Sequence, residues 1–154
     1  MKKNIFKTYM RTLENAPGTK IFRSVFVNDE NGREYDVLRG GELSCAYFVS
    51  FVLRAFNLID APHSTVATTL ARMKKAGWHA VSAHESRSGD VVVWEPVPSA
   101  DGETHAHIGF YLGNEIAVSN NSQTRVPAKH HMTFKGKRSI THIFRFDGWV
   151  THHL

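Results

Sequence analysis

The residues best suited to chemistry in this chain are one cysteine and the histidines. Cys45 is the only cysteine among 154 residues, so no intrachain disulfide can form and a free thiol has to be explained. A thiol becomes a nucleophile when its thiolate is stabilised, which the positive end of a helix dipole and a nearby imidazole both do. Apolar neighbours such as Leu43 and Phe48 equally suit a buried structural cysteine. Residue type alone leaves both interpretations open.

The position of Cys45 favours the reactive interpretation. Apolar residues after Gly41 recur at helical spacing, and Ser44 stands where an N-cap would. The pattern therefore predicts a helix with Cys45 in its first turn, where unpaired backbone N–H groups stabilise a thiolate. His107 begins the strand pattern of residues 107–112 and is the candidate base.

The strand patterns of residues 107–112 and 115–120 predict a hairpin that supplies a third residue. If Gly113-Asn114 forms a two-residue turn, Asn120 lies opposite His107 on the same face. An amide oxygen there could accept the imidazole N–H and fix the tautomer of the ring. A three-residue loop would place Asn121 there instead. We predict a catalytic set of Cys45, His107 and Asn120, with Asn121 as the alternative.

The elements that position these residues change in character along the chain. Helical patterns dominate up to Gly77, and strand patterns dominate after Gly89. This order predicts an α+β fold, with the helix that carries the nucleophile packed on an antiparallel sheet. The predicted helices cover residues 4–15, the segment after Ser44 and residues 64–73; the predicted strands cover 21–27, 91–94, 107–112, 115–120 and 140–146.

The length and composition predict one domain over residues 1–154. A content of 42% hydrophobic residues is enough to build a single core. Within it we expect an N-terminal helix and hairpin (1–34), the catalytic motifs (35–121) and closing strands (122–154).

Three separate segments, in this order, resemble the NlpC/P60 family and its CHAP relatives. YDVLRGGELSCAYFVSFVL (residues 35–53) has a Tyr, a Gly pair and a Cys that begins a helix. SGDVVVW (88–94) resembles the family's Gly-Asp strand. HAHIGFYLGNEIAVSNN (105–121) resembles its His-x-Gly-x-Tyr strand, which leads to a polar third residue. The matching residues are Tyr35, Gly40, Gly41, Cys45, Gly89, Asp90, His107, Gly109 and Tyr111.

The resemblance implies a papain-like fold and hydrolysis of a peptide or amide bond, often in peptidoglycan, through an acyl-enzyme on Cys45. It implies that Tyr35 helps to bind the substrate or the oxyanion, together with the backbone N–H of Cys45. The family commonly has Asp before the Cys, where it often contacts substrate. Ser44 stands at that position here, so the resemblance implies that Ser44 is the second substrate or oxyanion residue, beside Tyr35, and a departure from the usual wall-peptide specificity is open. Two alternatives remain: an acyltransferase of the same superfamily, and a non-catalytic basic module that binds the cell wall.

The remaining features bear on cofactors, partners and location. Although His105, His107, His130 and His131 could suggest zinc, the sequence has neither a His-Glu-x-x-His helix nor paired cysteines, so we predict no metal and no cofactor.

The net charge of +5 favours anionic partners such as wall polymers, but the basic residues are dispersed and no nucleic-acid partner is expected. No stretch approaches the roughly 18 apolar residues of a transmembrane helix. A signal peptide is not visible either, so a cytoplasmic location and export by a non-Sec route both remain open. The oligomeric state is not predicted.

Overall fold

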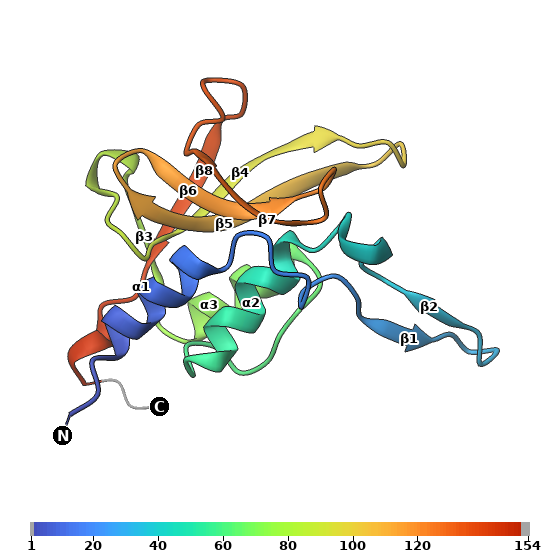
Figure 1. Ribbon diagram of the computed structural model, residues 1–154, viewed down its shortest axis with the longest axis horizontal. Coiled ribbons are helices and arrows are strands. Elements are labelled where there is room, and N and C mark those ends of the chain that lie inside the picture. Colours follow the sequence, from blue (N-terminus) through green and yellow to red (C-terminus); the bar gives the residue numbers. More distant parts are fainter. Residues whose placement is uncertain (1, 152–154) are drawn as a thin grey trace.

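Three α-helices lie on one side of a six-stranded antiparallel sheet in the computed structural model, which describes residues 2–151 (Figure 1). The strand order is β3-β8-β4-β5-β6-β7. The predicted α+β fold is confirmed, and none of the helices in the described part of the chain has the length and apolarity of a membrane span. The helices are α1 (Ile5–Asn15), α2 (Cys45–Ala55) and α3 (Val66–Lys75), with short 3-10 turns at Arg39–Gly41, Ala83–Glu85 and Gly148–Val150. The strands of the main sheet are β3 (His79–Val81), β4 (Val91–Pro98), β5 (Thr104–Gly113), β6 (Ile116–Asn121), β7 (Val126–His131) and β8 (Ile140–Arg145).

A small hairpin projects from this body. Strands β1 (Phe26–Asn28) and β2 (Glu34–Asp36) pair only with each other and extend away from the sheet in Figure 1. The predicted strand over residues 21–27 is therefore wrong in its first half. Phe22 instead packs in the core, with its ring centroid 4.9 Å from that of Phe48, and anchors a loop.

Helix α2 is held against the sheet by apolar packing. Its buried residues Phe48, Val49 and Val52 belong to the same core cluster as Ile108 and Phe110 of β5. Full burial of one such side chain contributes about 1.5–3 kcal/mol. This contact determines where the first turn of α2, and with it Cys45, meets β5.

The opposite face of the sheet is also buried. Trp94 is fully buried there and donates its indole N–H to the carbonyl of Met132 at 2.6 Å. Burial on both faces explains why β4 reads Val-Val-Val-Trp rather than alternating polar and apolar residues. The cluster on this face comprises Val92, Trp94, Tyr111, Ala117, Met132 and Ile143.

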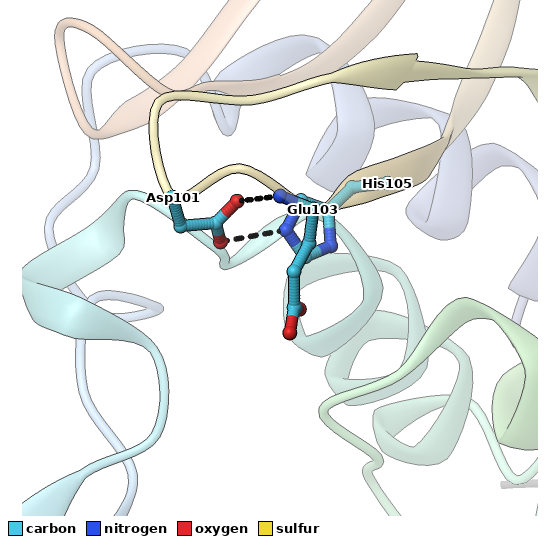
Figure 2. A group of neighbouring side chains, drawn as sticks. All are labelled: Asp101, Glu103 and His105. Carbon is cyan, nitrogen blue, oxygen red and sulfur yellow. Dashed lines mark hydrogen bonds and ion pairs between the residues drawn. The ribbon is translucent and has the colours of Figure 1, made fainter.

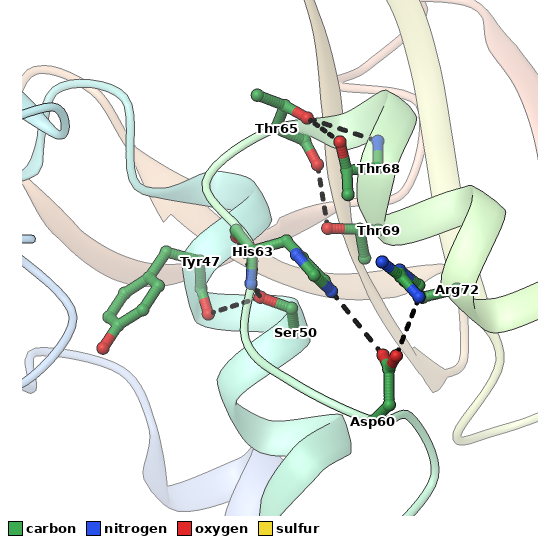
Figure 3. Close-up of polar contacts among 8 residues, drawn as sticks. All are labelled: Tyr47, Ser50, Asp60, His63, Thr65, Thr68, Thr69 and Arg72. Carbon is green, nitrogen blue, oxygen red and sulfur yellow. Dashed lines mark hydrogen bonds and ion pairs between the residues drawn. The ribbon is translucent and has the colours of Figure 1, made fainter.

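Polar contacts fix the connection from α2 to α3, as Figure 3 shows. The Ser50 hydroxyl donates to the carbonyl of His63 at 2.9 Å and accepts its backbone N–H at 2.7 Å. Asp60 pairs with Arg72 at 2.9 Å, and Thr65 caps the start of α3. Thr65 and Cys45 both line one cavity, so these contacts stabilise part of the wall of that cavity.

The turn between β5 and β6 lies one residue later than predicted. Gly113 pairs with Ile116, so the turn residues are Asn114 and Glu115, with φ values of 51° and 61°. A register shift follows between Tyr111 and Gly113. The sequence favoured Gly-Asn because a Glu rarely adopts positive φ. The favoured register is therefore wrong, whereas the alternative register, which sets residue 121 opposite residue 107, is the one found over Gly109–Tyr111. Residues 119 and 121, rather than residue 120, share a face with residue 107.

The loop before α2 is organised by one carboxylate. Asp36 accepts backbone N–H groups from Val25 and Leu38 at 2.9 Å and from Gly40 at 2.8 Å. Desolvation raises the pKa of Asp36, but these hydrogen bonds outweigh it and hold the pKa below its usual value. The next residue, Gly41, has φ of +105°, and a Cβ there would lie 2.7 Å from the carbonyl oxygen of Arg125. The path into α2 therefore requires a glycine at this position.

Replacing Asp36 tests this organisation. Asp36→Ala leaves three backbone donors without their acceptor, so we expect the free energy of unfolding to fall by about 1–3 kcal/mol. Urea denaturation measures the change. Asp29→Ala is the matched control, because Asp29 accepts two backbone N–H groups in the turn of the small hairpin, away from α2. Unchanged stability of Asp36→Ala would contradict the anchoring role of this carboxylate.

Candidate active site

Cys45 is the first residue of α2, as the sequence predicts. Ser44 occupies the N-cap position, but its side chain makes no capping hydrogen bond; only its carbonyl takes part, accepting the N–H of Phe48 at 2.8 Å. The Ser44 hydroxyl is fully buried and has no partner among the described residues. The backbone N–H groups of the first turn are therefore not consumed by a cap and remain directed at Cys45.

Cys45 and His107 line one cavity of about 830 Å³. Small-molecule and peptide subsites commonly occupy volumes of about 300–1,000 Å³. The walls come from the start of α2, the segment at Thr65, and strands β5, β6 and β7. Residues far apart in the sequence thus line the same cavity as the thiol.

The thiol is protonated in the free protein. Burial raises the pKa of Cys45 above its ordinary value. Hydrogen bonds from the backbone N–H groups of Ile108 and Ala46, together with the positive charge of Arg138, act in the opposite direction but do not cancel the effect of burial. The site therefore keeps a neutral thiol in surroundings that favour the thiolate once a proton acceptor takes part.

Arg138 is a residue of the cavity that the sequence did not indicate. Its Nε donates to the carbonyl of Glu95 at 3.0 Å, and its Nη2 donates to the carbonyl of His105 at 2.9 Å. These two bonds hold the guanidinium at the cavity, where its charge acts on both Cys45 and His107. It lies before β8 in a basic stretch with no motif, so only the fold brings it to the thiol.

The His107 ring is neutral at physiological pH. Burial is the largest of the causes that lower its pKa to about 3, and the positive charge of Arg138 acts in the same direction. The ring packs against Trp94, with 5.3 Å between centroids. A neutral imidazole has one nitrogen with a free lone pair, so this ring is in the form that can accept a proton.

Ser119 is the direct partner of His107. The Nε2 atom of His107 lies 2.8 Å from the Ser119 hydroxyl, which in turn lies 2.7 Å from Nε2 of His130 on β7. Ser119 is only 2% exposed. Sequence reasoning missed both Ser119 and His130, because the wrong register turned residue 119 to the other face. A signal was present in the alternative register: when residue 121 lies opposite His107, residue 119 lies on the same face, because side chains two residues apart on a strand share a face.

The two asparagines that were predicted beside His107 make other contacts. The Asn120 amide donates to the carbonyl of Gly41 at 2.8 Å, and its Oδ1 has no partner among residues 2–151. The side-chain oxygen of Asn121 accepts the backbone N–H groups of Gln123 and Thr124 and so closes the turn after β6. The structure therefore directs Asn120 to the loop before α2 and brings Ser119 to the imidazole.

Tyr35 lies outside the cavity. It belongs to β2 of the projecting hairpin, pairs with Val27 and is 49% exposed. It is not among the residues that line the space in front of Cys45. Tyr35 is thus not part of the cavity wall, whereas the resemblance to the family implied a role for it at the substrate or the oxyanion.

One group of potential metal ligands occurs among the described residues, namely Asp101, Glu103 and His105, of which His105 lines the cavity. The Asp101 carboxylate lies 2.8 Å from Nε2 of His105 and accepts the backbone N–H of Glu103 at 2.9 Å. Figure 2 shows how these three residues face one another. Arg39 also donates to this carboxylate, at 3.0 Å. The N–H of Glu103 is the largest of the causes that lower the pKa of Asp101 to about 2. The carboxylate is thus already engaged by a cation and a ring, and it stabilises the β4–β5 turn.

Comparison with protein-family models matches residues 32–145 to the NlpC/P60 family. The chain belongs to the NlpC/P60 family. The match covers all three segments on which the resemblance rested, and that prediction is confirmed. Members of the family are papain-like cysteine peptidases and amidases, so this NlpC/P60 protein is an enzyme of that class. A search of curated proteins finds no match.

The charge of Arg138 gives a direct test of the electrostatics at Cys45. Arg138→Gln removes a positive charge near the thiol, so we expect the pKa of Cys45 to rise further and alkylation by iodoacetamide at neutral pH to slow. The rate follows the thiolate fraction, which falls about tenfold for each unit by which the pKa rises. Rates measured by mass spectrometry across a pH series give the midpoint, which in the unmodified protein should lie above the value of about 8.5 for a free thiol.

Arg138→Lys retains the charge and serves as the matched control for this test. It should alkylate at nearly the rate of the unmodified protein. An Arg138→Gln variant that alkylates as fast as Arg138→Lys at every pH would show that the charge does not reach the sulfur.

Proposed function

We propose that this NlpC/P60 enzyme hydrolyses peptide or amide bonds with Cys45 as nucleophile and His107 as general base. The observation that carries the proposal is that a thiol at the start of α2 and a neutral imidazole on β5 line the same cavity. The imidazole is already bound through Nε2 to Ser119, so its other nitrogen is left for the thiol proton.

The resting charges define the first step of the mechanism. Because both partners are neutral, His107 takes the thiol proton as the sulfur attacks the carbonyl carbon of the substrate. A C–S bond forms and the carbonyl π electrons move to oxygen. The backbone N–H of Cys45 at the helix start is the donor we assign to this oxyanion.

The second half of the reaction returns the proton. His107 gives it to the leaving amine as the C–N bond breaks, which leaves an acyl group on Cys45. Water then attacks the thioester with His107 again as base, and the acid product and the free thiol are released. Arg138 supports the thiolate whenever it is present, since its positive charge lowers the pKa of the thiol.

We assign the orientation of His107 to Ser119 and a structural role to Asn120. The Ser119 hydroxyl is within hydrogen-bonding distance of the ring, whereas the Asn120 amide donates its hydrogen bond to the carbonyl of Gly41. Asn120 then acts on the site through the loop that leads into α2. Tyr35 receives no role in this scheme, because the projecting hairpin keeps it away from the cavity.

Peptidoglycan stem peptides are the substrate class that we propose. The family supports a peptide or peptidoglycan substrate, and the net charge of +5 favours an anionic wall polymer. Ser44, at the position where the family commonly has Asp, is fully buried and does not line the cavity. Substrate contacts on this side must therefore come from other residues, and Glu42 is the acidic residue nearest in sequence that lines the cavity.

Loss of the nucleophile or the base tests the reaction. Cys45→Ala should give no turnover of purified muropeptides, and His107→Gln should lower kcat by about 10²–10⁴-fold. Mass spectrometry of the products measures both and identifies the bond that is cut. His142→Gln is the matched histidine control, because His142 is exposed on β8 and does not line the cavity.

Four outcomes would contradict parts of this assignment. Hydrolysis by folded Cys45→Ala would reject the nucleophile, and full activity of His107→Gln would reject the base. Transfer of the acyl group to an added amine or lysolipid faster than to water would identify an acyltransferase instead. Binding of wall polymer without cleavage, together with an unreactive Cys45, would identify a binding module.

The roles of Ser119 and Asn120 can be distinguished because the two variants should change different quantities, kcat for Ser119 and the free energy of unfolding for Asn120. Ser119→Ala removes a neutral hydrogen bond to the base, worth about 0.5–1.5 kcal/mol, so kcat should fall up to about tenfold with little change in KM. Asn120→Ala leaves the carbonyl of Gly41 unpaired and should mainly lower the free energy of unfolding, by about 1–3 kcal/mol. Steady-state kinetics and urea denaturation of both variants measure the two effects. If Asn120→Ala lost more kcat than Ser119→Ala at unchanged stability, the orienting role would belong to Asn120.

A further inference from the structure

The His130 ring is fixed in the sheet beside the site. It stacks on Phe134 with 4.0 Å between centroids and an interplanar angle of 12°, and its centroid lies 5.4 Å from that of Trp94. Both of its nitrogens have polar partners, the His131 carbonyl and the Ser119 hydroxyl. A ring with a packed plane and two assigned nitrogens has little freedom to rotate.

The position of the proton on His130 follows from its partners. Nδ1 lies 2.9 Å from the carbonyl oxygen of His131, which can only accept, so Nδ1 carries the hydrogen. Burial is the largest of the causes that lower the pKa of His130, and the ring is therefore neutral. Its Nε2 then has only a lone pair and accepts the hydroxyl hydrogen of Ser119 across 2.7 Å.

The same accounting extends to His107. Ser119 has a single hydroxyl hydrogen, which goes to His130, so toward His107 its oxygen can only accept. The contact of 2.8 Å therefore requires a hydrogen on Nε2 of His107. The lone pair of the neutral His107 ring is then on Nδ1, the nitrogen that Ser119 leaves available for the thiol of Cys45.

We propose that His130 is a positioning residue that acts through Ser119 to hold His107 in the tautomer whose Nδ1 can accept the proton of Cys45. The relay runs from the carbonyl of His131 through the His130 ring and the Ser119 hydroxyl to His107. This inference rests on the proposed function for its catalytic meaning, but the tautomer itself exists without substrate. Its direction is set at the His131 carbonyl, because a backbone oxygen cannot donate.

A ring without nitrogens at position 130 removes the acceptor that fixes the direction of the Ser119 hydroxyl hydrogen. In His130→Phe the ring can still stack on Phe134, but Ser119 has no acceptor and is free to donate to Nε2 of His107. The alternative tautomer, with the hydrogen on Nδ1, then becomes populated, and it has no lone pair for the thiol. His130→Gln restores a carbonyl acceptor near the position of Nε2 and should recover part of the effect.

Nuclear magnetic resonance of histidine labelled with ¹⁵N and ¹³C tests the tautomer directly in the full chain. The signal of His107 is assigned by its loss in His107→Gln. We expect the Nε2–H form in the unmodified protein, a shift toward the Nδ1–H form in His130→Phe, and no shift in the exposed control His142→Gln. An Nδ1–H tautomer of His107 in the unmodified protein overturns the inference whether or not any variant folds.

Kinetics with a cleaved muropeptide test the effect on turnover. His130→Phe should lower kcat up to about tenfold at nearly unchanged KM, as Ser119→Ala does, because both disturb the same hydrogen bond to the base. If His130 acts through Ser119, the double variant Ser119→Ala/His130→Phe should be no slower than Ser119→Ala alone. Losses that multiply in the double variant, or an unchanged kcat and tautomer in His130→Phe, overturn the inference.

Failure of this inference is distinguishable from failure of the proposed function. Hydrolysis by Cys45→Ala would remove the proposed function, and the tautomer of His107 would still be measured without substrate. Conversely, a protein that needs Cys45 and His107 for turnover but keeps its tautomer in His130→Phe would retain the proposed function and lose the relay.

Discussion

At Gly109, strands β5 and β6 approach so closely that no side chain fits between them. A Cβ at this position would lie 2.6 Å from the carbonyl oxygen of Val118, 2.7 Å from Cβ of Ser119 and 3.1 Å from the Trp94 ring. Gly109 is paired with Ser119 and is two residues from His107 on the same face, so this contact determines which residue reaches the imidazole. The other features of the site, including the relay toward β7 and the packing of both rings on Trp94, depend on this spacing.

Burial dominates the electrostatics of the cavity. It raises the pKa of Cys45 and lowers that of His107, so the resting pair is neutral on both sides. The positive charge of Arg138 lowers both pKa values, so it opposes the effect of burial at Cys45 and adds to it at His107. In the proposed mechanism the site therefore separates charge only while a substrate is attacked, when the thiolate reacts as it forms. Such a thiol is protected from indiscriminate reaction in the absence of a substrate, since the thiolate rather than the thiol is the nucleophile.

Two segments distant in sequence hold the loop before α2 from opposite sides. Asp36 binds its backbone N–H groups, and Asn120 binds the carbonyl of Gly41. The loop has to be this tightly held because its glycines have positive φ and pass close to Arg125. Its end sets the direction of the first turn of α2, and so the position of the sulfur. Asn120 is in this way important to the site without touching the imidazole.

The sequence by itself determined the α+β fold class, the family, and the placement of Cys45 at a helix start, because helical periodicity and short ordered motifs are local properties. It also marked His107 as the candidate base, at the start of the predicted strand over residues 107–112. Only the tertiary structure decided the neighbours of that histidine. The register depended on a Glu115 with positive φ, which residue preferences disfavour, and strand β7 was obscured by Pro127, which is tolerated there because β7 is an edge strand. With β7 unrecognised, His130 had no place beside Ser119. Arg138 likewise comes near Cys45 only through folding, because contacts between residues far apart in the sequence produce no local pattern from which they could be predicted.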